Sequence, residues 1–309
     1  MRSDELTEPR VRPAVIIDGP LMAYKSYFAL PRSITDTAGE SVNAAYGFAG
    51  MTLRLVADFQ PRSLIVAWDS PRPSFRDKIY KEYKQGRISL PDDLVISQVP
   101  KVKAVIELLG VKVVSVPGFE ADDVIASYCE FWKKQKQSCR IVTGDHDAIQ
   151  LVSDPYVKLH LSLRGVTRFI EYDQDAVVSE FGFSPSRYVD FVALKGDVSD
   201  NLPGVPGFGS KRARALVAST ASFDEILESP KLQEKLKSIP DLIERLRRTF
   251  NLATLVRDVE IPESTEWELP PKTTLDMLDE MGLKALRERA EQLRFLDHGE
   301  PPHSADVKE

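Results

Sequence analysis

Residues 117–147 read PGFEADDVIASYCEFWKKQKQSCRIVTGDHD, and this stretch decides the fold. Its middle carries apolar residues at helical spacing from Ala121 to Phe131, and a short apolar strand follows at residues 140–143. Acidic residues stand at both ends of this pattern, namely Glu120, Asp122, Asp123, Asp145 and Asp147. Side chains at a helix start lean toward its N-terminus, so the first three acids are expected to point into one space.

Each half of the stretch also has an ordinary structural explanation. Acids in the first turn of a helix oppose the positive end of its dipole. A Gly-Asp pair after a strand is common turn chemistry. The interpretation as a functional site therefore depends on whether the rest of the chain brings similar residues to the same place.

The rest of the chain repeats this arrangement. Apolar strands are predicted at residues 14–17, 64–68 and 112–116, and the first two run into Asp18 and Asp69. Helical stretches separate the strands, which predicts an α/β fold with a mostly parallel sheet flanked by helices. Ligands of such sheets bind beyond the carboxyl ends of the strands. Nothing structural requires an acid after each strand, so we expect these acids to form one site.

Clustered carboxylates repel one another and raise one another's pKa unless a cation neutralises them. Ligation by oxygen alone suits Mg²⁺ or Mn²⁺, and the chain has no His or Cys spacing that would bind zinc. We therefore expect a carboxylate cradle for two divalent metal ions, of the kind that supports phosphodiester hydrolysis.

Between residues 72 and 103, eight Lys and Arg residues face four acids. On a continuous helix one face would carry Arg76, Tyr80, Tyr83, Lys84 and Arg87. Rings alternating with cations suit single-stranded nucleic acid, because bases stack on the rings and phosphates pair with the charges. A solvated helix whose tyrosines pack on the core fits the same spacing equally well.

A second candidate region follows at residues 196–212. Asp197 and Asp200 precede a turn rich in Gly and Pro, whose glycines would let backbone amides approach a phosphate. A helix starting near Ser210 would add its positive end together with Lys211 and Arg212. A plain connector between two helices explains the same residues equally well.

Composition sets wider limits. The 309 residues suffice for about two domains. The net charge of −6 argues against a nucleic-acid partner unless basic residues are segregated, as they are in residues 72–103. No apolar run reaches the ~18 residues of a membrane span, and the N-terminus has no signal core. Two cysteines make no disulfide framework, so we expect a cytoplasmic protein.

Taken in order, these segments resemble the bacterial 5′-nuclease family, which comprises the 5′→3′ exonuclease domain of DNA polymerase I and its stand-alone and phage flap-endonuclease relatives. The resemblance covers roughly residues 13–295. The matching segments are Ile16-Ile17-Asp18-Gly19, Ala67-Trp68-Asp69, Phe75-Arg76 through Tyr83-Lys84 to Arg87, Gly118 to Asp123, Thr143 to Asp147, and Gly196 to Asn201 with the turn after it.

The resemblance implies a fold like that of PIN-type 5′-nucleases, with a helical arch over the site and a helix–three-turn–helix module that binds duplex DNA. The expected divisions are a flexible leader (1–12), a nuclease domain (13–190) containing the arch (about 72–103), a helical DNA-binding domain (191–296) and a flexible tail (297–309). No polymerase domain is expected, so the chain would act as a separate protein.

The resemblance also implies roles for particular residues. One metal site matches Asp18, Asp69, Glu120, Asp122 and Asp123, and the other matches Asp145, Asp147, Asp197 and Asp200. Lys84 and Arg87 match catalytic cations that steer the scissile phosphate, and Tyr83 matches an aromatic that stacks on the frayed end. The backbone of Gly204, Val205, Gly207 and Gly209 matches a K⁺ site. With the residue patterns above, the expected DNA contacts are Arg76, Tyr80, Tyr83, Lys211 and Arg212.

Three residues depart from the family pattern: Lys25, His146 and Ala148 stand where Arg, Lys or Arg, and Leu are common. None of them removes a metal ligand.

We therefore expect a monomeric, metal-dependent hydrolase, a structure-specific 5′-3′ exonuclease and flap endonuclease of DNA replication and repair. Its substrate would be DNA with a 5′ flap, nick or gap, including RNA-primed DNA, and no membrane would be involved. One alternative is a catalytically inactive DNA-junction binding protein of the same fold, which needs the basic residues but not the acids. The other is a small-molecule phosphohydrolase, which has no use for an arch.

Overall fold

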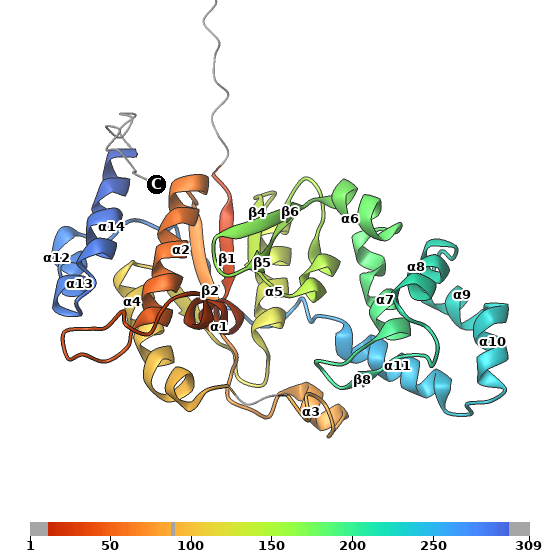
Figure 1. Ribbon diagram of the computed structural model, residues 1–309. Helices are drawn as coiled ribbons and strands as arrows, with labels where there is room; N and C mark the ends of the chain where they lie inside the picture. The colour runs from red at the N-terminus through yellow and green to blue at the C-terminus, as the bar shows by residue number, and fades with distance from the viewer. Residues whose placement is uncertain (1–11, 88–89, 297–309) are drawn as a thin grey trace, which may run out of the picture.

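The computed structural model describes residues 12–87 and 90–296 (Figure 1). The predicted leader, apart from Arg12, and the predicted tail lie outside these residues.

A six-stranded sheet forms the centre of the molecule, in the order β3-β2-β1-β4-β5-β6. Strands β1 to β5 are parallel, and β6 runs antiparallel to β5, which confirms the predicted mostly parallel sheet. The strands are β1 (Ala14–Asp18), β2 (Ser63–Ala67), β3 (Lys112–Val114), β4 (Cys139–Thr143), β5 (Val157–Arg164) and β6 (Arg168–Tyr172). Because neighbouring strands are parallel, the acids that follow β1, β2 and β4 meet at one edge.

Both faces of the sheet are covered by helices, which is why the central strands β1 and β2 are buried along their whole length. Alternate residues of β1 enter different cores: Ile16 packs toward α5 (Ala121–Lys134), and Ile17 packs toward α2 (Asn43–Phe59). The α2 face also holds α1 (Gly19–Ala29) and α4 (Val99–Leu108). This arrangement fixes the strand ends, and with them the acids, in a rigid frame.

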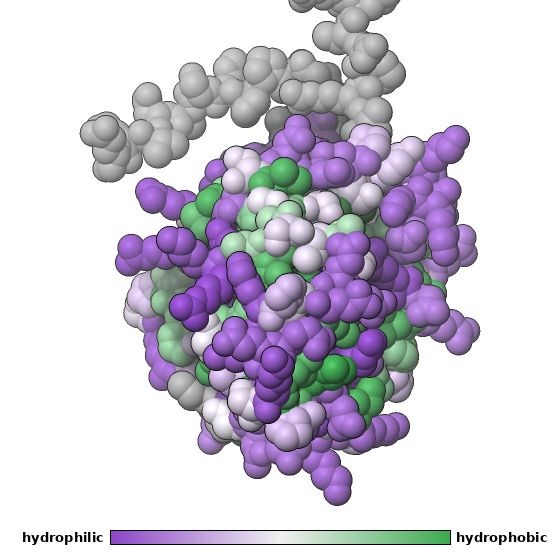
Figure 2. Space-filling model, turned by 90° about the vertical axis from the view of Figure 1, so that its right-hand side faces the viewer, coloured by the Kyte–Doolittle hydropathy of each residue, from purple (hydrophilic) through white to green (hydrophobic). Residues whose placement is uncertain are grey.

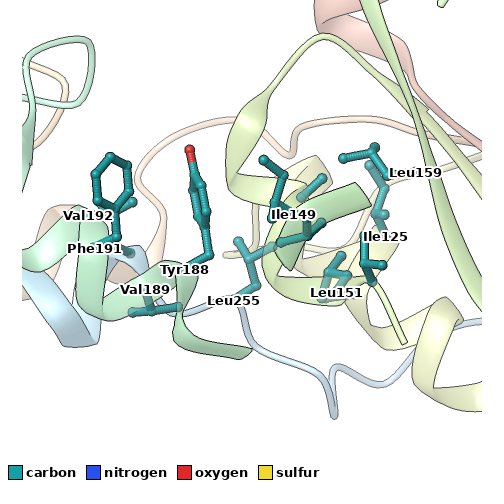
Figure 3. Packing of buried hydrophobic residues seen from close by; sticks show 14 of the residues in the cluster. Ile125, Ile149, Leu151, Leu159, Tyr188, Val189, Phe191, Val192 and Leu255 are labelled. Carbon is teal, nitrogen blue, oxygen red and sulfur yellow. The ribbon is translucent and has the colours of Figure 1, made fainter. Parts of the chain in front are cut away.

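A helical module continues the α5-side core away from the sheet (Figures 1 and 3). It contains α6 (Gln174–Phe181), η3 (Pro185–Arg187), α7 (Tyr188–Lys195), β7 (Gly196–Asp197), β8 (Leu202–Pro203), α8 (Ser210–Ala218), α9 (Phe223–Glu228), α10 (Pro230–Leu236) and α11 (Leu242–Ala253). The short helix η2 (His146–Leu151) joins β4 to this module. The view from this end shows mainly hydrophilic side chains with small apolar patches between them (Figure 2).

Residues 254–271 contain no helix or strand and run back along α5 to the opposite side of the sheet. There α12 (Lys272–Leu275), α13 (Met277–Glu280) and α14 (Lys284–Leu296) pack on α2 and α4 (Figure 1). The prediction of one helical domain over residues 191–296 is therefore wrong. The reason is physical: Leu275, Leu278 and Leu286 are buried in the core on the α2 side, not among the helices of the module.

The predicted continuous helix over residues 76–87 is also wrong. The helix α3 spans only Phe75–Ile79, and turns follow to Gly86, with Lys84 in the left-handed region at φ 56°. Beyond the two undescribed residues, η1 (Asp93–Gln98) is a π-helix that leads into α4. The turns direct the Tyr83 side chain into the core. In a regular helix Tyr83 would instead share one face with Arg76, Tyr80, Lys84 and Arg87.

No helix in the described part of the chain is long and apolar enough to cross a membrane.

Candidate active site

Six of the nine predicted metal ligands line one cavity of about 670 Å³ at the carboxyl edge of the sheet. They come from the end of β1, the segment after β2, the start of α5, the segment from β4 into η2, and β7, and they are Asp18, Asp69, Asp122, Asp145, Asp147 and Asp197. An adjoining cavity of about 410 Å³ shares Asp69 and adds Glu120, with Lys84 and Arg87 between the two. The fold thus gathers acids that lie more than 170 positions apart in the chain.

Asp18 is the most deeply placed of these acids, with 5% of its surface exposed. One carboxylate oxygen accepts a hydrogen bond from the Leu21 amide at 3.1 Å and so caps α1. The other accepts from the Thr143 hydroxyl at 2.6 Å, and the same hydroxyl accepts from the Asp145 amide at 3.0 Å. Thr143 therefore holds Asp18 and the backbone of Asp145 in a fixed relation, a role that the sequence did not suggest.

The raised pKa values of these carboxyls show that the cavity has too little positive charge to neutralise them. Burial, relieved in part by the bonds from Thr143 and Leu21 and increased by the charges of Asp145 and Asp69, raises the pKa of Asp18 to about 7. Burial and neighbouring carboxylates also raise the pKa of Asp122 and of Asp147 well above the usual range. A cation would relieve this repulsion, so the donor set fits hard divalent ions.

The described residues contain no group of three or more acidic, His or Cys side chains arranged to hold one ion directly. Ions in a cavity lined by these acids would therefore contact some of them through water, or directly once side chains rotate. Mutual repulsion favours such a spread arrangement, in which some carboxylates accept bonds from backbone amides, as Asp145 does from the Asp147 amide (2.9 Å) and Asp69 from the Ala121 amide (2.8 Å).

Glu120 and Asp200 are held by residues 83–87, in the turns after α3. The Lys84 ammonium donates to Glu120 at 2.9 Å, and the Tyr83 hydroxyl donates to Glu120 at 3.1 Å and to Asp200 at 2.8 Å. Arg87 pairs with Asp200 as well. Burial acts to raise the pKa of Asp200, but the charges of Lys84 and Arg87 outweigh it and lower that pKa. The two predicted catalytic cations thus lie beside the acids, as expected.

Asp123 and Arg76 do not belong to the site, which corrects two predictions. Asp123 is fully buried and accepts two bonds from the Arg76 guanidinium, at 2.6 and 2.8 Å. Arg76 is 1% exposed and also donates to the carbonyls of Leu252 and Thr254. An arginine in this position cannot contact DNA, and a carboxylate in this position cannot reach an ion in the cavity.

Tyr83 and Tyr80 are not free to stack on bases either. Tyr83 is 3% exposed with its hydroxyl bonded as above, and the Arg248 guanidinium lies 4.5 Å from the centre of the Tyr80 ring. Lys211 and Arg212, in contrast, are exposed at the start of α8.

Comparison with known proteins identifies the family. Residues 13–182 match the family model described as 5′-3′ exonuclease, N-terminal resolvase-like domain, and residues 183–275 match 5′-3′ exonuclease, C-terminal SAM fold. The chain belongs to the 5′-3′ exonuclease family. It is 37% identical over 267 residues to DNA polymerase I of Mycobacterium tuberculosis, which is 84% of this chain and 29% of that protein. It is 35% identical over 292 residues to thermostable DNA polymerase I of Thermus thermophilus, 93% of this chain and 33% of that protein.

The chain therefore spans about a third of the length of these curated relatives. Among solved structures, T5 5′-exonuclease with bound zinc aligns with a TM-score of 0.62 and 19% identity, over 91% of this chain and 98% of that one. The catalytic core of Rad2 in complex with DNA substrate aligns with a TM-score of 0.53 and 15% identity, over 92% of each. These likenesses confirm the predicted α/β fold.

In this family member the predicted phosphate turn connects α7 to α8. Gly196, at φ 79°, and Gly204 pack backbone against backbone, and a Cβ at Gly204 would lie 2.3 Å from the Lys195 carbonyl carbon. The turn also contains the glycines of the predicted K⁺ site, where the Gly207 carbonyl accepts a bond from Arg212 at 2.9 Å and the Val205 carbonyl accepts from the Phe208 amide.

The departures from the family pattern lie around the same edge. The Lys25 ammonium donates to the Ser162 carbonyl at 2.7 Å and lies beside Gly144. His146 is exposed, and Ala148 is buried.

Sequence reasoning missed the wall opposite the acids. This wall contains Phe181, Tyr188, Phe191, Lys195 and Arg214. The signal available in the sequence was weak: Lys195 precedes Gly196-Asp197 directly, but the aromatic residues follow an ordinary core spacing.

Proposed function

We propose that this chain is a structure-specific 5′-nuclease that hydrolyses DNA phosphodiesters, as a 5′-3′ exonuclease and flap endonuclease. The observation that carries the proposal is the convergence of buried, mutually repelling carboxylates in one cavity, with raised pKa values for Asp18, Asp122 and Asp147. Such a cluster is costly to the fold unless it binds cations, and clusters of this kind mark functional sites.

Two groups of residues would hold the ions, Mg²⁺ or Mn²⁺. The first group is Asp18, Asp69, Glu120 and Asp122, from β1, the segment after β2 and the start of α5, and the second is Asp145, Asp147, Asp197 and Asp200, from the start of η2, from β7 and from the β7–β8 turn. When bound, two such ions supply activation of water and stabilisation of the leaving oxygen in an in-line displacement at phosphorus.

The chain's own side chains supply the remaining chemistry. Lys84 and Arg87 stand between the two cavities and offer positive charge to the phosphate oxygens as negative charge develops on them. To do so they must leave Glu120 and Asp200, which they hold here, and a cation near those acids would free them. Thr143 keeps Asp18 oriented throughout.

We further propose that the substrate is DNA with a 5′ flap, nick or gap, including RNA-primed DNA, and that the chain acts as a monomer. Lys211 and Arg212 at the exposed start of α8 suit a duplex phosphate, and the turn at Gly204–Gly209 would hold K⁺ beside it. A cytoplasmic location completes the proposal. The thiols of Cys129 and Cys139 form no disulfide and share a hydrogen bond at 3.7 Å, which agrees with a reducing compartment.

A labelled 5′-flap duplex tests the proposal. We expect cleavage with Mg²⁺ or Mn²⁺, binding without cleavage in Ca²⁺, and loss of cleavage when Asp145→Asn is combined with Asp147→Asn. Asp276→Asn combined with Glu280→Gln, exposed on α13 and its start, is the matched control and should cut normally. Cleavage that survives the first double variant would refute the proposal.

The alternative is a DNA-junction binding protein without activity. It is favoured by one observation, that Glu120 and Asp200 are engaged by protein donors. Such a protein would shift the flap duplex in a gel and leave it intact across a titration of Mg²⁺.

A further inference from the structure

The cavity that holds the acids has a second wall that the proposed chemistry does not use. This wall comes from the end of α6, from α7 and from the start of α8. It presents three aromatic rings and two cations, which are Phe181, Tyr188, Phe191, Lys195 and Arg214. Cations opposite a cluster of carboxylates, in one cavity, suggest a place for an anion that also touches the acids' side.

Tyr188 supplies a fixed hydroxyl to this wall. Its ring is 3% exposed and packs edge-on against Phe181, with the ring centres 5.4 Å apart, and against Phe191 at 5.6 Å. The hydroxyl points away from Val189 and Leu255 (Figure 3). The hydroxyls of Tyr128 and Tyr172 bond protein oxygens, whereas that of Tyr188 has no such partner among the described residues.

The Tyr188 hydroxyl is accessible from the cavity that Tyr188 lines. Burial, followed by the charges of Asp147, Asp145 and Asp197, raises the pKa of Tyr188, so the hydroxyl stays protonated and acts as a donor. It therefore offers the cavity a hydrogen-bond donor that a ligand can reach.

The two cations are held by rings and not by acids. The Arg214 guanidinium lies 4.4 Å from the centre of the Phe181 ring and donates to the Glu180 carbonyl at 2.9 Å, and its Nε is buried without a partner. The Lys195 ammonium lies 5.3 Å from the Phe191 ring. No carboxylate of the described residues comes within 4 Å of either cation. Glu180 also lines the cavity, but its carboxylate accepts a bond from Tyr172 at 2.5 Å.

The rings are not free to stack on a base, because they pack on one another and Arg214 and Lys195 cover two of them. What the wall offers is donors and positive charge. We propose that Tyr188, Lys195 and Arg214 form a subsite for a DNA phosphodiester that lies next to the scissile phosphodiester on the same strand. This inference rests on the proposed nuclease function and adds residues that position the strand within that site.

A scan with neutral linkages tests the subsite. Flap substrates carry one methylphosphonate at a time on either side of the cleavage position, and cleavage rates are compared for wild type, Tyr188→Phe and Arg214→Gln. We expect each variant to lose about tenfold in cleavage, the equivalent of one charge-assisted hydrogen bond. At one adjacent linkage the methylphosphonate should cost the wild type about tenfold and the Arg214→Gln variant almost nothing further.

Tyr27→Phe is the matched control, because Tyr27 is buried, its hydroxyl bonds the Asp93 carboxylate, and neither residue lines the two cavities; its cleavage should match the wild type. If the losses from Arg214→Gln and from the methylphosphonate multiply at every position, the subsite is refuted while the nuclease function stands. If the wild type does not cut at all, the nuclease function fails. Binding of the same substrates in Ca²⁺ then tests the subsite. The dissociation constants of the wild type and of Arg214→Gln must show the same coupling to the methylphosphonate at one linkage.

Discussion

Replacing Arg76 by Met tests the interpretation of the most deeply buried ion pair. The Arg76 guanidinium makes two bonds to Asp123 and one each to the Leu252 and Thr254 carbonyls, at 2.6 to 3.2 Å. The pair therefore joins α3, α5 and the chain after α11. The substitution removes every one of these donors and leaves a methionine of similar length in their place.

The expected cost follows from what is left behind. Asp123, with no exposed surface, would keep only two amide donors, Val256 at 3.0 Å and Glu120 at 3.3 Å. Breaking a buried pair from one side costs about 3–5 kcal/mol, and the remaining amides favour the lower end. We expect a loss of about 3 kcal/mol, equivalent to a fall in Tm of roughly 6–12 °C for a chain of this size.

Urea unfolding followed by circular dichroism measures this loss, with Arg72→Met as the matched control. Arg72 is half exposed and pairs with Asp77 at the surface, so its loss should cost less than about 1 kcal/mol. The double variant with Asp123→Leu should recover part of the stability, because a buried pair is often replaced by apolar residues at little cost.

Magnesium titrations complete the test. The Asp123→Asn variant, assayed at a temperature where it is folded, should need the same Mg²⁺ concentration within about threefold, whereas Asp122→Asn should need over ~tenfold more. An Arg76→Met loss below ~1 kcal/mol, or a large shift in the Mg²⁺ requirement of Asp123→Asn, would show that the pair serves the site directly.

Three further predictions concern other parts of the molecule. Burial lowers the pKa of His160 to about 4, so the unfolded chain binds more protons than the folded chain between pH 4 and 6.5. The free energy of unfolding therefore falls as the pH drops through that window. In urea unfolding, His160→Gln should remove about 3 kcal/mol of that fall. Gly204→Ala should cost about 1–3 kcal/mol because its Cβ meets the Lys195 backbone, whereas Gly209→Ala, with nothing within 4 Å but at the N-cap of α8, should cost less than about 1 kcal/mol in thermal unfolding. Lys84→Met should lower kcat about 10²–10³-fold while DNA binding in Ca²⁺ persists, and an equal loss of both would count against its role at the phosphate.

The sheet and the acids at its edge could be predicted from the sequence because each signal is local. Strands such as residues 14–17 are apolar runs, and the register of parallel strands carries Asp18, Asp69 and Asp145 to the same edge. The position of each acid follows from the strand that precedes it.

The conformation of residues 76–87 and the buried pair could not be predicted in the same way. Arg76 and Tyr83 show the spacing of one helical face, but their partners Asp123 and Asp200 lie 47 and 117 positions away. Local periodicity does not reveal such distant partners, which bury an arginine and break the helix after Ile79. The packing of Leu275 and Leu286 against α2 is equally non-local.

Residues 254–271 run along the length of α5 and are hydrogen-bonded to it. Successive turns of the helix are tied to this segment through Asp123, Ser127, Tyr128 and Trp132. These bonds hold α5 against movement along its axis. The depth at which Glu120 and Asp122 stand in the cavity is therefore fixed by residues more than 130 positions downstream. The position of these two acids thus depends on a segment that contributes no residue to the lining of either cavity.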